Sequence, residues 1–119
     1  MTEQVHWLLE VDIKPGQLEA FRALMREMVA ATQANEPDTL NYEWLIDADQ
    51  KTCHIYERYR DSAATLIHLG TFGATFAKRF MAVTDHKRIV VYGNPNADVT
   101  RALDRIGAVY LTPFGGFAR

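Results

Sequence analysis

The segment at residues 55–69 constrains the fold more than any other part of the chain. It begins as a run of branched and aromatic residues typical of a β-strand, ends in charged residues, and continues at once as a helix. Within that helix His68, Phe72 and Phe76 recur every four residues, and a helix presents such residues on one side. The sequence therefore predicts an imidazole beside an aromatic stripe, close to the strand that carries Glu57.

Hydrophobic periodicity predicts the other elements. Alternating apolar residues indicate strands, and apolar residues at helical spacing indicate helices. Gly70 and Gly73 lie inside the second predicted helix, each at a cost of about 1 kcal/mol relative to alanine, so we expect a break or bend there. The predicted order is a strand at 5–13, a helix at 17–35, strands at 40–46 and 52–60, a helix from 61 or 62 to about 83, a strand at 88–92, a short helix at 97–106 and a short strand at 108–111.

This order predicts an α+β protein of the ferredoxin-like βαββαβ class, with an antiparallel sheet and both helices on one face. The helix and strand after residue 93 form a C-terminal extension. The opposite face of the sheet is too apolar for a solvated surface and too polar for a core, and such a surface suits contact between two copies. We therefore expect a homodimer. The residues predicted on that face are His6, Leu8, Glu10, His54, Tyr56, Arg58, Arg88, Val90 and Tyr92.

Size and composition restrict the classes of partner. A chain of 119 residues is enough for one domain, here residues 1–119 with a core at 5–92 and an extension at 93–119. The net charge is −2 with no basic cluster, so neither nucleic acid nor a membrane surface is an expected partner. Cys53 is the only cysteine, and no signal peptide or membrane span is recognisable; both observations fit the cytoplasm.

His68 and Glu57 are the candidate catalytic residues. Histidine titrates near neutral pH and can accept a proton from a phenol or an enol, but His68 could equally pack on the aromatic stripe as a structural residue. Glu57 alternates in phase with the inward-facing residues, where a carboxylate must find a partner. It could orient a substrate or His68, or it could pair with Arg22, Arg26 or Lys78.

Four aromatic residues, Tyr42, Trp44, Tyr59 and Phe72, are candidates for lining a flat pocket for a planar ligand, although packing in the core is the commoner fate of such side chains. The four histidines are scattered without the spacing of metal ligands, so no metal site is expected.

The last eight residues carry Phe114 and Phe117 on either side of two glycines. Aromatic side chains of this kind are costly to leave in water, so we expect both to pack on the body of the protein or across a dimer.

Four short motifs together resemble the antibiotic biosynthesis monooxygenase family, whose members are dimeric α/β barrels. The resemblance covers residues 5–92. It rests on residues 14–16 (Lys-Pro-Gly) followed by Phe21, on 36–37 (Glu-Pro) leading to 40–43 (Leu-Asn-Tyr-Glu), on 56–61 (Tyr-Glu-Arg-Tyr-Arg-Asp), and on 68–69 (His-Leu) in the second helix. In such relatives the pocket lies between sheet and helices, and Tyr42, Glu57 and His68 match frequent family positions.

The resemblance implies an enzyme that oxidises a small aromatic quinol or phenol with dioxygen and needs no cofactor. In that interpretation His68 is the base and Glu57 orients it, and the rate should rise as the imidazole becomes neutral. Two alternatives stay open: a haem-binding or haem-degrading relative with His68 as the axial ligand, and a non-catalytic dimeric protein that binds a small molecule.

Overall fold

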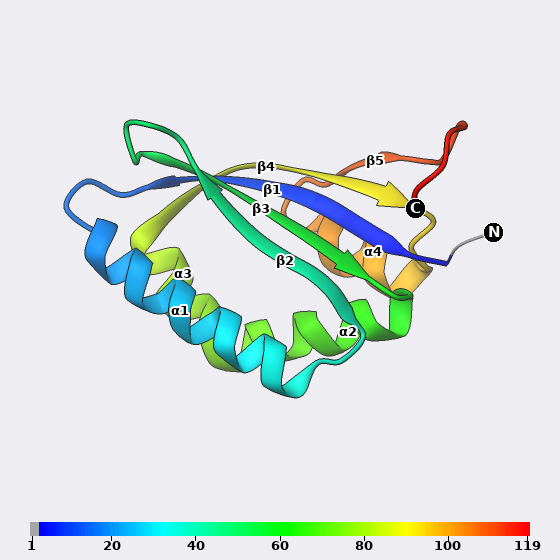
Figure 1. The fold of residues 1–119 in the computed structure, drawn as a ribbon, viewed down its shortest axis with the longest axis horizontal. Helices are drawn as coiled ribbons and strands as arrows, with labels where there is room; N and C mark the ends of the chain where they lie inside the picture. Colours follow the sequence, from blue (N-terminus) through cyan, green and yellow to red (C-terminus); the bar gives the residue numbers. More distant parts are fainter. Residues whose placement is uncertain (1–2) are drawn as a thin grey trace.

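A five-stranded sheet with helices packed against one face forms the body of the protein in this computed structural model, which describes residues 3–119 (Figure 1). The strand order is β2-β3-β1-β4-β5, with antiparallel neighbours except for the parallel pair β4–β5. This arrangement confirms the predicted ferredoxin-like α+β class with its C-terminal extension. The elements are β1 (Val5–Ile13), α1 (Leu18–Asn35), β2 (Thr39–Ile46), β3 (Thr52–Tyr59), α2 (Ser62–Thr71), η1 (Phe72–Phe76), α3 (Ala77–Val83), β4 (Thr84–Gly93), α4 (Ala97–Asp104) and β5 (Val109–Leu111).

The inward face of the sheet follows the alternation of the sequence. In β1 the side chains of Val5, Trp7 and Val11 are buried against the helices, and in β3 Ile55 and Glu57 are buried in the same layer. Antiparallel pairing of these central strands places Trp7 directly opposite Glu57. The prediction that Glu57 faces the helices is therefore correct, and it brings a carboxylate into an otherwise apolar layer.

The second predicted helix is interrupted near its glycines, as expected. Asp61 caps α2 by accepting a hydrogen bond from the Ala64 backbone N–H at 2.9 Å. The α-helix gives way to one π-helical turn at η1 and resumes as α3, which ends at Val83. A π-helical turn widens the helix locally and is often found at functional sites. Here it carries Phe72, one turn after His68.

Strand β4 begins at Thr84, four residues earlier than the sequence predicts. Its first half pairs with the end of β1, and the register shifts between Glu10 and Val11. The residues from Asp85 to Arg88 are exposed and polar, so they show no alternation from which a strand could be inferred. Pairing with β1, rather than the local pattern, extends this strand.

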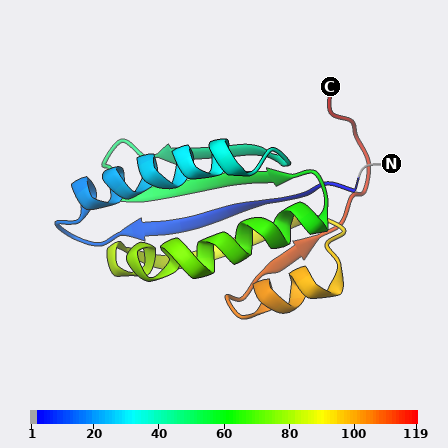
Figure 2. The same ribbon diagram turned by 90° about the horizontal axis from the view of Figure 1, so that it is seen from below.

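The C-terminal extension closes one end of the helical layer. Helix α4 begins at an Asn96 cap, whose side chain accepts a hydrogen bond from the Val99 N–H at 3.0 Å. Val99 and Leu103 are buried, in one apolar cluster with Trp7 and Tyr59. Figure 2 shows α4 beside α2, while α1 lies along the other half of the sheet.

The tail after β5 does not pack on its own chain. Phe114 is fully exposed and Phe117 is 82% exposed, so the expectation that they pack on the body is wrong. Figure 1 shows the tail running off the face of the sheet away from the helices. Packing across a dimer stays a prediction.

The face of the sheet opposite the helices has the predicted mixed character. Leu8, Tyr56 and Tyr92 are half-buried there, and His6 lies between the two tyrosines. None of the helices among the described residues is long and apolar enough to cross a membrane.

Candidate functional site

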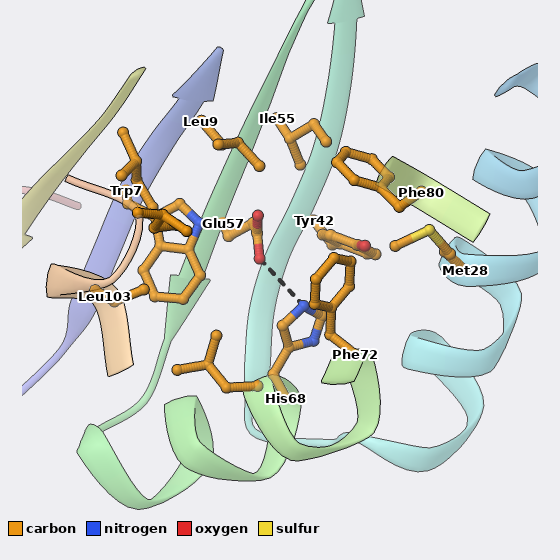
Figure 3. Close-up of a pocket in the computed structure, with 13 residues that line it drawn as sticks. Trp7, Leu9, Met28, Tyr42, Ile55, Glu57, His68, Phe72, Phe80 and Leu103 are labelled. Carbon is orange, nitrogen blue, oxygen red and sulfur yellow. Dashed lines mark ion pairs between the residues drawn. The ribbon is translucent and has the colours of Figure 1, made fainter. Parts of the chain in front are cut away.

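His68 lies between two carboxylates beneath the sheet. Its Nδ1 is 2.8 Å from Oε1 of Glu36. Its Nε2 is 3.2 Å from Oε1 of Glu57 (Figure 3). The three residues are 6%, 7% and 4% exposed, respectively. A histidine can bond two carboxylates only with both ring nitrogens protonated or by sharing protons with them. The trio is therefore a buried network of three titratable groups.

Glu36 is held in place by the end of α1. Its backbone N–H donates to the Thr32 carbonyl at 2.9 Å, which closes the last turn of the helix. Pro37 then turns the chain toward β2. From β2, the Thr39 hydroxyl donates to Oε1 of Glu36 at 2.9 Å. The carboxylate is thus fixed by its own helix cap and by the following strand before it meets His68.

Glu57 is held from the sheet. The Tyr59 hydroxyl, two residues further along β3, donates a short hydrogen bond to Oε1 of Glu57, the same oxygen that faces His68. The Tyr59 ring packs on Trp7, with ring centroids 5.0 Å apart. Both contacts of this carboxylate within residues 3–119 use Oε1, so Oε2 is the oxygen that can meet a ligand.

These contacts set the protonation of the site. Burial favours neutral imidazole, but the hydrogen bonds and charges of Glu36 and Glu57 outweigh it and raise the pKa of His68 to about 9. Burial raises the pKa of Glu36, and the hydrogen bond and charge of His68 more than reverse this, so that its pKa lies below the usual value. At neutral pH His68 is therefore an imidazolium that contacts Glu36 and Glu57.

Two buried phenols next to this network stay neutral. Burial, and then the negative charge of Glu57, raise the pKa of Tyr42 well above 10. The same causes act on Tyr59. Neither phenol is available as a base at physiological pH, so they act here as hydrogen-bonding and packing groups.

A partly open cavity of about 70 Å³ lies between the sheet and the helices beside His68. That volume corresponds to about two water molecules at the volume of liquid water, and it is smaller than a cavity known to hold benzene. Its walls are apolar except at His68 and Glu57 and at the polar edges of Tyr42 and Trp7 (Figure 3). The lining residues are Trp7, Leu9, Met28, Tyr42, Ile55, Glu57, His68, Leu69, Phe72, Phe80, Ile89, Leu103 and Ile106.

The structure brings four of the six predicted site residues to this cavity. His68, Glu57, Tyr42 and Phe72 line it, and the Tyr42 and His68 rings meet edge to face with centroids 5.2 Å apart. Tyr59 lies behind Glu57 and does not line the cavity. None of the three cations that the sequence offered as partners pairs with Glu57, whose partners are His68 and Tyr59.

 Trp44 lines a second cavity of about 80 Å³ at the other end of the sheet, with its ring against Phe21 and Phe80. Alternation along β2 gives it the same face as Tyr42, but two residues along a strand carry it beyond the reach of His68. Cys53 also lines this second cavity.

Sequence reasoning missed several residues of the site, among them Glu36, Trp7 and Leu103. In the sequence Glu36 stands out only as part of the Glu-Pro motif at residues 36–37 that supports the family resemblance. A usable signal was present, because Met28, Thr32 and Glu36 continue one buried stripe at four-residue spacing. Alternation along residues 5–13 places Trp7 on the inward face but indicates no role in the pocket, and Leu103 reaches the cavity from the C-terminal extension.

No group of three or more histidine, cysteine or carboxylate side chains within residues 3–119 is arranged to hold a metal ion. What the arrangement offers chemically is proton transfer and stabilisation of an anion. Glu57 can accept a proton through Oε2, and the His68 imidazolium can stabilise negative charge that develops next to it.

Solved structures share this fold at low sequence identity. MupZ from Pseudomonas fluorescens aligns with a TM-score of 0.86 and 21% identity, covering 99% of this chain and 96% of that one. SnoaB, a cofactor-independent oxygenase from Streptomyces nogalater, aligns with a TM-score of 0.66 and 15% identity, covering 81% and 97%. PA3566 from Pseudomonas aeruginosa aligns with a TM-score of 0.62 and 24% identity, covering 76% and 91%. At these identities the likeness concerns the fold alone.

A comparison with curated proteins found no significant match. The model of one protein family, described as antibiotic biosynthesis monooxygenase, matches residues 5–90, which include β1, β2, β3, most of β4 and every polar residue of the site. The match spans most of the chain, and the chain therefore belongs to the antibiotic biosynthesis monooxygenase family.

Proposed function

We propose that the protein is a monooxygenase that uses dioxygen and no cofactor to oxidise a small phenol or quinol. The observation that carries this proposal is the Glu57 carboxylate, buried at the wall of an apolar cavity and bonded to a charged His68. Membership of the family and the fold shared with SnoaB, a cofactor-independent oxygenase, support a monooxygenase-type function.

A phenol with a free para position can supply every electron that this reaction needs. The para C–H bond becomes a C=O bond, one atom of dioxygen enters the resulting quinone, and the other leaves as water. The phenol loses four electrons and dioxygen gains four, so no external reductant is required. The protein's task is to generate the electron-rich phenolate, which reacts with dioxygen far more readily than the phenol does, and to exclude bulk water.

We propose roles for the two catalytic candidates that differ from those the sequence suggested. With a pKa of about 9, His68 already carries its proton at neutral pH and is a poor base there. We assign the base to Glu57, whose Oε2 takes the proton of the substrate hydroxyl. His68 then stabilises the phenolate as an imidazolium, and Glu36 keeps His68 protonated. Tyr42 and Phe72 form the slot for the ring.

We further propose that the protein works as a homodimer in the cytoplasm. The half-buried face of Leu8, Tyr56 and Tyr92 is the surface for a second copy, since it is too apolar to remain in water at low cost. The lone buried thiol of Cys53 is compatible with a reducing compartment.

Haem ligation is the less well supported alternative. An axial histidine must offer a nitrogen lone pair to iron, and both nitrogens of His68 face carboxylates at 2.8 and 3.2 Å. Binding haem would break at least one of these contacts. Titration of the protein with haemin should therefore give no Soret shift that depends on His68.

Oxygen consumption with para-unsubstituted phenols of increasing size, from 3-hydroxyacetophenone to 1-naphthol, tests the proposed function. The reaction should proceed with a chelator and without added flavin, and ¹⁸O₂ should place one labelled atom in the quinone. Glu57→Gln should lower the rate by roughly 10²- to 10⁴-fold, the usual contribution of a general base. Glu27→Gln, at an exposed ion pair with Arg79, is the matched control and should keep the rate. If neither phenol is oxidised, the non-catalytic alternative is correct.

A further inference from the structure

The indole N–H of Trp7 is a buried donor without a hydrogen-bond acceptor among residues 3–119. Trp7 is 2% exposed, and its Nε1 has no hydrogen-bond partner among the described residues. An indole nitrogen can only donate. Leaving such a donor buried and unpaired costs about 1–3 kcal/mol, and in native proteins such groups are rare enough to need an explanation. Since the residue lines the cavity beside His68, a bound ligand is the natural acceptor.

The position of Trp7 relative to Glu57 indicates where on a ligand the acceptor for this N–H would lie. The two residues are directly opposite each other on β1 and β3, and Tyr42 is opposite Glu57 on the other side. Side chains of such cross-strand partners leave the sheet about 5 Å apart. Figure 3 shows the nitrogen edge of the Trp7 indole turned toward Glu57 at the wall of the cavity. A donor and an acceptor therefore stand side by side.

We propose that Trp7 Nε1–H binds an acceptor oxygen of the substrate, and that the substrate is a single-ring phenol bearing a carbonyl group. The assignment of the hydroxyl to Glu57 rests on the proposed function; the assignment of the carbonyl to Trp7 rests on the unpaired N–H. The small cavity favours a single ring over a fused ring system, and even a single ring requires a wall residue to move; we assign that movement to Phe72, on the π-helical turn.

The unpaired donor should make the site discriminate between ligands with and without an acceptor oxygen. A ligand without the acceptor oxygen buries the Trp7 N–H without a partner, whereas a ligand with it satisfies the donor. Two probes of closely similar shape isolate this difference: 3-hydroxyacetophenone has the carbonyl oxygen, and 3-ethylphenol lacks it.

The experiment measures binding of both probes by calorimetry, to the wild type and to Trp7→Phe. The wild type should prefer 3-hydroxyacetophenone by roughly 3- to 10-fold, the range of one neutral hydrogen bond. Trp7→Phe keeps an aromatic ring but has no N–H, and should lose this preference. Trp44→Phe is the matched control, because it also removes a buried indole N–H but at a residue that lines the other cavity. It should keep the preference.

A spectroscopic measurement keeps the proposal testable if Trp7→Phe does not fold. The chain has two tryptophans, so the indole N–H region of a ¹⁵N spectrum contains two signals that Trp44→Phe assigns. The Trp7 signal of the wild type should move on addition of 3-hydroxyacetophenone and much less on addition of 3-ethylphenol. Equal shifts with both probes, no binding of 3-hydroxyacetophenone, or a preference that survives in Trp7→Phe would overturn the proposal and leave a buried water as the partner of Trp7.

The two proposals can fail separately. Carbonyl preference that depends on Trp7, without any oxygen consumption, would support the binding role and reject the monooxygenase. Oxygen consumption without such a preference would support the monooxygenase and reject the binding role of Trp7.

Discussion

Glu36 and His68 are 32 residues apart in the sequence, and their side chains meet at 2.8 Å. Glu36 ends α1 and His68 lies in the last turn of α2, so this contact joins the two helices beneath the sheet. On its other side the His68 ring reaches β3 through Glu57. One histidine thus connects both helices to the sheet, and its charge belongs both to the stability of the fold and to the chemistry of the site.

Stability should fall as pH rises through the titration of His68. The pKa of His68 is raised from an unfolded value near 6.5 to about 9, so its contribution is fully present below pH 6.5 and is lost as pH rises through 9. The size of the effect is on the order of 3 kcal/mol. Urea denaturation at pH 6.5, 8 and 9.5 measures it. In His68→Gln the decline should be absent; a wild type equally stable at all three values would contradict the prediction.

Glu36 should act as a positioning residue for the charge on His68. Glu36→Gln removes one of the two carboxylates that raise the pKa of His68, so that pKa should fall from about 9 by at least about one unit. NMR titration of the His68 ring signals measures this, and the pH profile of activity should move in the same direction. Glu27→Gln serves as the control because it removes an exposed carboxylate far from the site. An unchanged His68 titration in Glu36→Gln would rule out this role.

Helix α4 should limit the size of the substrate. Ile106, just after α4, lines the cavity and is 43% exposed, so Ile106→Ala should widen the mouth at little cost in stability. We expect kcat/KM for 1-naphthol to rise relative to that for 3-hydroxyacetophenone. Val109→Ala shortens a comparably exposed residue in β5 that does not line the cavity, and should leave the ratio unchanged. The same ratio in all three proteins would show that α4 does not control access.

The protein should be a dimer that depends on the outer face of the sheet. Tyr56 is half-buried there, with its hydroxyl 3.2 Å from Nδ1 of His6, and Tyr56→Asp would place an unpaired charge in the interface. Light scattering should give twice the 13.5 kDa monomer mass for the wild type and a lower mass for Tyr56→Asp. Met81→Asp, on the exposed side of α3, should remain dimeric. A wild type of monomer mass would end this idea.

The sequence by itself determined the elements and their faces. Alternation in residues 5–13 and 52–60 fixed which side chains of β1 and β3 point inward, so the burial of Glu57 could be predicted. Helical spacing placed His68 and Phe72 on one side of a helix. These are local properties, set by the periods of two and 3.6 residues that the backbone imposes. They report the face on which a side chain lies and nothing about the partner it meets.

Only the tertiary structure decided the partners. Glu36 became part of the site because α1 ends beside α2, and Trp7 because β1 pairs with β3. Trp44 shares a face with Tyr42 but lies outside the site, because distance along the strand matters as much as direction. The protonation of His68 depends on all of this: two carboxylates from distant segments, brought within hydrogen-bonding distance in a buried site, reverse the effect that burial alone has on an imidazole.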